Sequence, residues 1–163
     1  MRYKHWIGVG ASILLGLVFI IAGLGKSLHP VADAKISYDL KILLTFFPYL
    51  FTPTTVDVIF TYLPRLEILI GLLLVLGIAA KTISIITMVL ISIFMASNYW
   101  LLSQGLGYES CGCFGFIAES YLTVNVSFGI DIAMLTLAFI VLFCYQSNFT
   151  NVIPWFCRRG KTE

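Results

Sequence analysis

The sequence predicts an all-α integral membrane protein, a bundle of four transmembrane helices with an interfacial segment between the first two. Three observations support this fold class: 60% of the 163 residues are apolar, only 11% are charged, and the mean hydropathy is +0.98. A soluble domain carries roughly 25% charged residues, so most of this surface must face lipid. The composition excludes a water-soluble monomer, a disordered chain and a nucleic-acid-binding domain, and a net charge of +2 is too small to indicate nucleic acid.

Four runs are long enough to cross a bilayer, which requires about 20 mostly apolar residues. They form one membrane domain over residues 1–163, with spans at about 6–26, 58–80, 82–103 and 122–145. The second run is compromised by two charges, Arg65 and Glu67. The first run is longer than the apolar core of a signal peptide and is followed by a poor cleavage site, so we expect a retained helix.

The connection between the first two spans, residues 27–57, is rich in apolar and aromatic side chains between residues 40 and 51. Pro48 and Pro53 limit this stretch, which is too short to span a bilayer. We therefore predict an interfacial or re-entrant segment here.

The distribution of Lys and Arg predicts the orientation, because cytoplasmic flanks are enriched in these residues. The connection 103–121 has two acidic residues and neither Lys nor Arg, whereas the tail carries Arg158, Arg159 and Lys161. Both termini are therefore predicted to be cytoplasmic, with the connections 27–57 and 103–121 outside.

One face of the first helix combines small residues with a charge. At 100° per residue, six positions fall on the same side: Gly8, Ser12, Gly16, Phe19, Gly23 and Lys26. Small residues let a second helix approach closely, so this face is predicted to pack inside the bundle. Lys26, at its outer end, either points into the bundle or reaches the lipid headgroups.

The other charges of the spans are Arg65, Glu67 and Asp131. A charge at mid-membrane costs on the order of 3 kcal/mol, so such side chains are usually paired or functional. We predict an ionic cluster of Lys26, Glu67 and Asp131 near the outer leaflet, with Arg65 joining it or reaching the headgroups. Glu67 is expected within ion-pair reach of Lys26 or Arg65. The alternative is that these charges only hold the helices together.

The outside connection also carries Cys111 and Cys113, separated by Gly112. Thiols facing an oxidising compartment tend to form disulfides. A disulfide between residues two apart closes a small, strained ring, and strained, exposed disulfides are easily reduced. The pair therefore suits a bond that is made and broken during turnover, and Cys111 and Cys113 are the candidate catalytic residues.

Two alternatives remain for this pair, copper or zinc binding together with His29, and an inert pair of thiols. We predict no metal site, because too few ligands are nearby. Cys144 and Cys157 belong to the cytoplasmic side and cannot reach the outside pair. Cys144 is expected to be a small buried apolar residue and Cys157 a free thiol.

Three motifs in order resemble the DoxX-like membrane proteins, and within them the MauE (methylamine utilisation) branch. Residues 16–26 are similar to the first-helix pattern Gly-x-x-Phe-x-x-Ala-Gly-x-x-Lys. Residues 64–71 are similar to the second-helix pattern Pro-x-x-Glu-x-x-x-Gly. Residues 111–115, Cys-Gly-Cys-Phe-Gly, resemble the MauE-type Cys-x-Cys-Phe-Gly.

The resemblance implies redox maturation of extracytoplasmic proteins. MauE is associated with forming the disulfides of the small subunit of methylamine dehydrogenase beside a thioredoxin-like partner, and DoxX relatives with sulfur-compound oxidation that feeds quinone. The layout is also similar to DsbB and to vitamin K epoxide reductases, which carry a second cysteine pair near a quinone. This chain has no second outside pair, so the resemblance leaves open whether a quinone takes the electrons.

With this resemblance, our leading hypothesis is a protein of the bacterial inner membrane that supports thiol–disulfide exchange with an extracytoplasmic thioredoxin-like protein or secreted redox protein through Cys111 and Cys113. Lys26, Arg65, Glu67 and Asp131 would order the outer end of the bundle and tune the thiols, since a nearby cation lowers a cysteine pKa. The alternatives are a non-catalytic membrane anchor of a secreted redox enzyme, and a small transporter or metal-handling protein.

Overall fold

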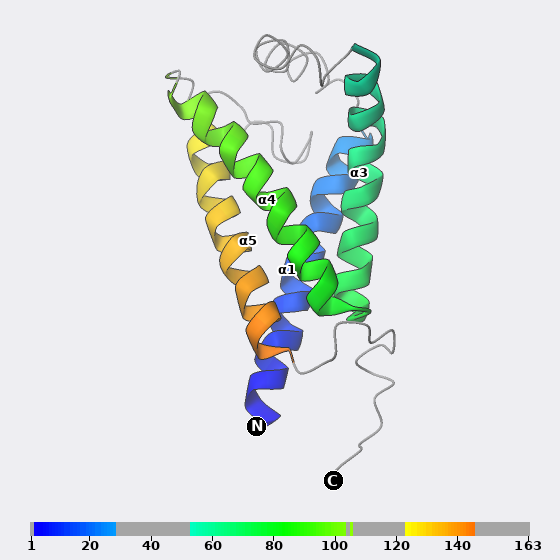
Figure 1. Ribbon diagram of the computed structural model, residues 1–163, viewed down its shortest axis with the longest axis vertical. Coiled ribbons are helices and arrows are strands. Elements are labelled where there is room, and N and C mark those ends of the chain that lie inside the picture. Colours follow the sequence, from blue (N-terminus) through cyan, green and yellow to red (C-terminus); the bar gives the residue numbers. More distant parts are fainter. Residues whose placement is uncertain (1, 29–52, 104, 106–122, 146–163) are drawn as a thin grey trace.

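The computed structural model describes residues 2–28, 53–103, 105 and 123–145, and this part of the chain is helical (Figure 1). Its helices are α1 (Arg2–Leu28), α3 (Pro53–Leu76), α4 (Ala80–Ser103) and α5 (Val124–Cys144). The connection predicted over residues 27–57 is shorter than expected, because residues 27–28 belong to α1 and residues 53–57 belong to α3. Its remaining residues from 29 to 52 lie outside the described part.

Three of these helices are long and apolar enough to cross a membrane: Tyr3–Leu28, Ala80–Trp100 and Val124–Cys144. The chain is therefore a membrane protein, as its composition predicted. Helix α3 is 24 residues long and exposes Leu66, Leu69 and Leu72. Apolar side chains on an outer surface suit contact with lipid, and the crossing of the membrane by α3 stays a prediction.

The boundary between α3 and α4 lies earlier than the sequence suggested. The predicted second span ran through residue 80, whereas α3 ends just before Gly77. The N–H of Gly77 donates to the carbonyl of Leu74 (3.1 Å) and that of Ile78 to the carbonyl of Leu73 (3.0 Å), with Gly77 at φ 69°. This is the Schellman arrangement, in which a left-handed glycine ends a helix.

The four helices pack as two pairs (Figure 1). Helix α1 lies along α3, and α4 lies along α5. The pairs are joined mainly by α1 against α5, whereas α3 and α4 make few contacts despite their short connection. The buried core takes residues from all four helices: Leu15, Phe19, Ile70, Leu74, Ile91, Met134 and Ala138. The inside of the bundle is thus apolar over most of its length.

The contact between α1 and α3 confirms the predicted packing face of the first helix. Gly8, Ser12, Gly16, Phe19 and Gly23 are all buried. The Ser12 hydroxyl donates to the carbonyl of Leu74 on α3 at 2.6 Å. Gly23 lies so close to α3 that a Cβ built on it would be 2.7 Å from the Pro64 carbonyl oxygen. Small side chains therefore bring the two backbones together, and this positions the C-terminal end of α1 against α3.

Candidate functional site

Polar side chains from all four helices meet inside the bundle, toward the end of α1 that carries Lys26. We call the set the polar cluster, and it consists of Lys26 (α1), Glu67 (α3), Asn98 (α4), and Ser127 and Asp131 (α5). Glu67, Asn98, Ser127 and Asp131 are buried. Buried polar groups require partners, so their contacts determine what the cluster can do.

Lys26 and Glu67 form the ion pair of the cluster. The Nζ of Lys26 lies 2.5 Å from Oε1 of Glu67, with 14% of the lysine side chain and 1% of the glutamate side chain exposed. Lys26 follows Gly23 by three residues on the face that packs against α3, which explains why its ammonium points inward and not toward the headgroups. One of the partners expected for Glu67 is therefore present.

Lys26 also contacts α4. Its Nζ lies 5.0 Å from the centroid of the Phe94 ring, a distance typical of a cation–π interaction. One side chain thus connects α1 with both α3 and α4. Because α3 and α4 pack little against each other, this bridge is one of the contacts that hold the two helix pairs together.

Asp131 and Asn98 connect α5 to α4. The Nδ2 of Asn98 donates to Oδ2 of Asp131 at 2.7 Å and lies 3.4 Å from Oγ of Ser127. Asn98 lies one helical turn after Phe94, which Lys26 contacts, so this hydrogen bond lies next to the ion pair of Lys26 and Glu67. Asn98 was missed by the sequence reasoning. Its signal is a polar amide in the uncharged run 82–103, four residues after Phe94 and hence on the same face of the helix.

Arg65 lies apart from the polar cluster. It is exposed, and its guanidinium carbon is 5.5 Å from the centroid of the Tyr62 ring on the same helix. Arg65 and Glu67 are two residues apart, which separates them by about 200° around a helix. Glu67 therefore faces the bundle while Arg65 faces outward, and the part of the predicted cluster that included Arg65 is not formed.

The acidic groups of the cluster outnumber its basic groups. It contains two carboxyl groups, Glu67 and Asp131, and one ammonium group, Lys26. The second carboxyl oxygen of Glu67, Oε2, is buried and has no hydrogen-bond partner among the residues that the structure describes. A buried acceptor without a donor is costly, so this oxygen is the least satisfied atom of the cluster.

The predicted redox pair, Cys111 and Cys113, lies outside the described residues, as do His29 and Cys157. In the sequence, the pair lies between the two helices that contribute Asn98 and Asp131 to the cluster. The connection that carries it leaves α4 five residues after Asn98 and enters α5 seven residues before Asp131. At 1.5 Å per residue, those helix ends lie about 8–10 Å along the helix axes from the cluster.

Among the described residues the one cysteine is Cys144, a free thiol at the C-terminal end of α5; it is half-buried, whereas the sequence predicted a buried residue. No group of three or more His, Cys, Asp or Glu side chains that could hold a metal ion is present within residues 2–28, 53–103 and 123–145.

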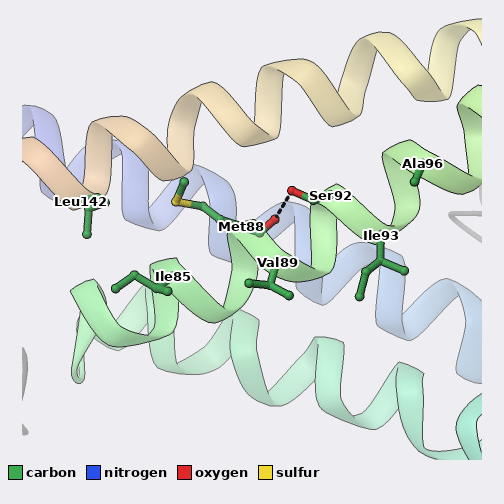
Figure 2. Close-up of a pocket in the computed structure, with 7 residues that line it drawn as sticks. All are labelled: Ile85, Met88, Val89, Ser92, Ile93, Ala96 and Leu142. Carbon is green, nitrogen blue, oxygen red and sulfur yellow. Dashed lines mark hydrogen bonds between the residues drawn. The ribbon is translucent and has the colours of Figure 1, made fainter.

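An apolar groove of about 620 Å³ lies on the outer surface of α4 (Figure 2). It is lined by Ile85, Met88, Val89, Ser92, Ile93 and Ala96 of α4 and Leu142 of α5. Its one hydroxyl, on Ser92, donates to the carbonyl of Met88 at 2.8 Å, drawn as the dashed line in Figure 2. The groove therefore offers apolar contact, which suits lipid acyl chains better than polar ligands.

Comparison with known proteins gives one match. The family model described as methylamine utilisation protein MauE matches residues 4–144, a range that contains the two helix motifs, the cysteine motif and the whole polar cluster. No curated protein matches the chain. No solved structure matches it either.

Proposed function

This chain belongs to the MauE family of membrane proteins, which is linked to methylamine utilisation, and on that premise we propose that it supports thiol–disulfide exchange outside the cytoplasmic membrane. Cys111 and Cys113 would exchange with a thioredoxin-like protein or a secreted redox protein. The observation that carries the proposal is the position of this pair in the chain. It lies on the connection that joins α4 to α5, with Cys111 eight residues after the end of α4 and Cys113 eleven residues before the start of α5.

The proposed exchange is balanced between thiols. A partner thiolate attacks one sulfur of the Cys111–Cys113 disulfide and forms a mixed disulfide, while the other cysteine leaves as a thiolate. The second partner thiol then attacks the mixed disulfide, and the partner becomes oxidised while Cys111 and Cys113 become reduced. Two electrons pass to the pair, and the two protons of the partner thiols are released or taken up by the pair.

The polar cluster would support this exchange by ordering the helix ends that carry the cysteine connection. The contact of Lys26 with Phe94 and that of Asn98 with Asp131 both fix α4, one against α1 and the other against α5. The pairing of Lys26 with Glu67 argues that the lysine acts on the thiols by positioning the bundle and not as an isolated positive charge.

The described residues do not fit a quinone head group. The groove on α4 offers only Ser92, whose hydroxyl already donates to its own helix, and Lys26 is already bound to Glu67. We therefore derive no step through a quinone.

The redox state of Cys111 and Cys113 in native membranes tests the proposal. Membranes are quenched in acid and alkylated with a maleimide that adds mass to each free thiol. We expect a disulfide that a mild dithiol reduces readily, because the ring is small and strained. Cys111→Ser or Cys113→Ser should abolish function while the protein still inserts, and one of the two should accumulate a covalent adduct with an extracytoplasmic partner.

Cys144→Ser is the matched control, because Cys144 lies at the opposite end of α5 and should form no adduct. Full function in the Cys111→Ser, Cys113→Ser double variant would reject thiol exchange. The chain would then be better explained as a membrane anchor of a secreted redox enzyme.

A further inference from the structure

We infer that the polar cluster is a proton-binding site, which holds one exchangeable proton on Asp131 while Glu67 stays ionised and paired with Lys26. This inference goes beyond the proposed function and does not depend on the cysteine pair. The inference rests on the charges of the cluster, on the hydrogen-bond partners of each carboxyl group, and on the Oε2 atom of Glu67, which has no hydrogen-bond donor among the described residues.

The charges that face the cluster can be counted helix by helix. Helix α1 contributes Lys26, α3 contributes Glu67 and α5 contributes Asp131. The residues of α4 at the cluster, Phe94 and Asn98, are not ionisable. With every group ionised, the described cluster would carry one net negative charge inside a bundle with lipid-exposed helices, which is strongly unfavourable.

The partners of the two carboxyl groups indicate where the proton rests. Glu67 accepts a hydrogen bond from an ammonium group, and this partner favours the ionised form. Asp131 accepts its hydrogen bond from the neutral amide of Asn98. A neutral carboxyl group at Asp131 therefore removes the excess charge without breaking the ion pair between Lys26 and Glu67.

The Oε2 atom of Glu67 shows separately that the described cluster has too few hydrogen-bond donors for its acceptors. Lys26 is bound to the other oxygen of Glu67, and the Asn98 amide is directed to Asp131 and Ser127. No described residue donates to Oε2. A proton requires no cavity, which fits a cluster that lies between closely packed helices.

Infrared spectroscopy of the full chain in lipid nanodiscs at neutral pH tests the inference. A protonated carboxyl group has a carbonyl stretching band that is separate from the carboxylate and amide bands, and the band moves when the proton is replaced by deuterium. We expect this band in the wild-type protein, with a shift in D₂O. Absence of a shifting carboxyl band in the wild-type protein overturns the inference without any variant.

Charge balance makes three variants informative. Asp131→Asn should remove the band because it removes the protonated group. Glu67→Gln should also remove it, because Asp131 can then ionise opposite Lys26. Lys26→Met should increase the band about twofold, because both carboxyl groups would have to be neutral. Persistence of the band in Asp131→Asn, or an unchanged band in both Glu67→Gln and Lys26→Met, contradicts the inference.

Glu163→Gln, at the last residue of the chain, is the control and should leave the band unchanged. Loss of the wild-type band on adding sodium or potassium chloride at constant pH would identify a metal-cation site and overturn the proton assignment. The Cys111→Ser, Cys113→Ser variant should keep the band. Its result separates the proton site from thiol exchange, since either can fail alone.

Discussion

Gly16 of α1 and Gly71 of α3 meet backbone to backbone. A Cβ built on Gly16 would lie 2.6 Å from the carbonyl oxygen of Gly71, and a Cβ built on Gly71 would lie 2.6 Å from the carbonyl oxygen of Gly16. Real Cβ atoms essentially never approach this closely. The two glycines thus let the backbones of α1 and α3 touch, and a larger side chain at either position would hold Lys26 and Glu67 farther apart.

Gly16→Ala and Gly71→Ala should each destabilise the protein by about 1–3 kcal/mol, because the backbones must separate to admit a methyl group. Thermal unfolding in detergent, followed by size-exclusion chromatography, measures the effect. Gly10→Ala is the control in the same helix, since nothing lies within 4 Å of the Cβ position there. A loss of stability for Gly10→Ala as large as that for Gly16→Ala would contradict the close contact.

Glu67→Ala should lower the stability by about 3–5 kcal/mol, because it leaves the Lys26 ammonium partly buried without its carboxylate. The folded yield and the thermal midpoint in detergent report the change. Arg65→Ala, two residues away on the same helix, should cost far less because Arg65 is exposed. Equal effects of the two substitutions would show that the ion pair does not contribute to stability.

Asn98→Ala should cost about 1–3 kcal/mol, because it leaves the buried carboxyl group of Asp131 without the amide that donates to it. Ser97→Ala is the neighbouring control, since Ser97 is exposed and its hydroxyl donates only within α4, to the carbonyl of Ile93. Hydrogen exchange of the α4 and α5 backbones should increase in Asn98→Ala alone. Identical exchange in both variants would argue against a link between α4 and α5 at this position.

The orientation is tested by labelling intact cells with a membrane-impermeant maleimide after mild reduction. A variant that keeps only Cys111 and Cys113 should be labelled, and one that keeps only Cys157 should not, because the basic tail is predicted to be cytoplasmic. Labelling of the Cys157 variant would reverse the predicted topology.

The sequence was enough to predict the features that follow from helical periodicity and from the free-energy cost of burying a charge. The buried face of α1 follows from small residues repeating every three or four positions, and the pairing expected for Glu67 follows from the free-energy cost of an unpaired charge inside the bundle. The end of α3 was harder to place. Ile78, Ala79 and Ala80 are as apolar as the helix before them, so composition does not reveal that Gly77 turns the chain.

Asn98 shows the limit for polar sites. A single amide in an uncharged run indicates a polar contact, but the sequence does not show which residue that contact reaches. Only the packing of α4 against α5 brings it to Asp131. The partner of Glu67 was predictable only as one of two cations, Lys26 or Arg65, because the choice depends on how α1 and α3 are rotated against each other.

The three-residue connection between α3 and α4 has a consequence for biogenesis. The two helices should leave the ribosome as a hairpin and insert together, yet each finds its main packing partner outside the hairpin, α3 in α1 and α4 in α5. Lys26 is synthesised 41 residues before Glu67. The ammonium group of α1 is therefore made before the carboxylate that pairs with it. We expect the outer end of α1 to stay in the headgroup layer until α3 arrives, and assembly to finish only when α5, the last helix of the described chain, joins the two pairs.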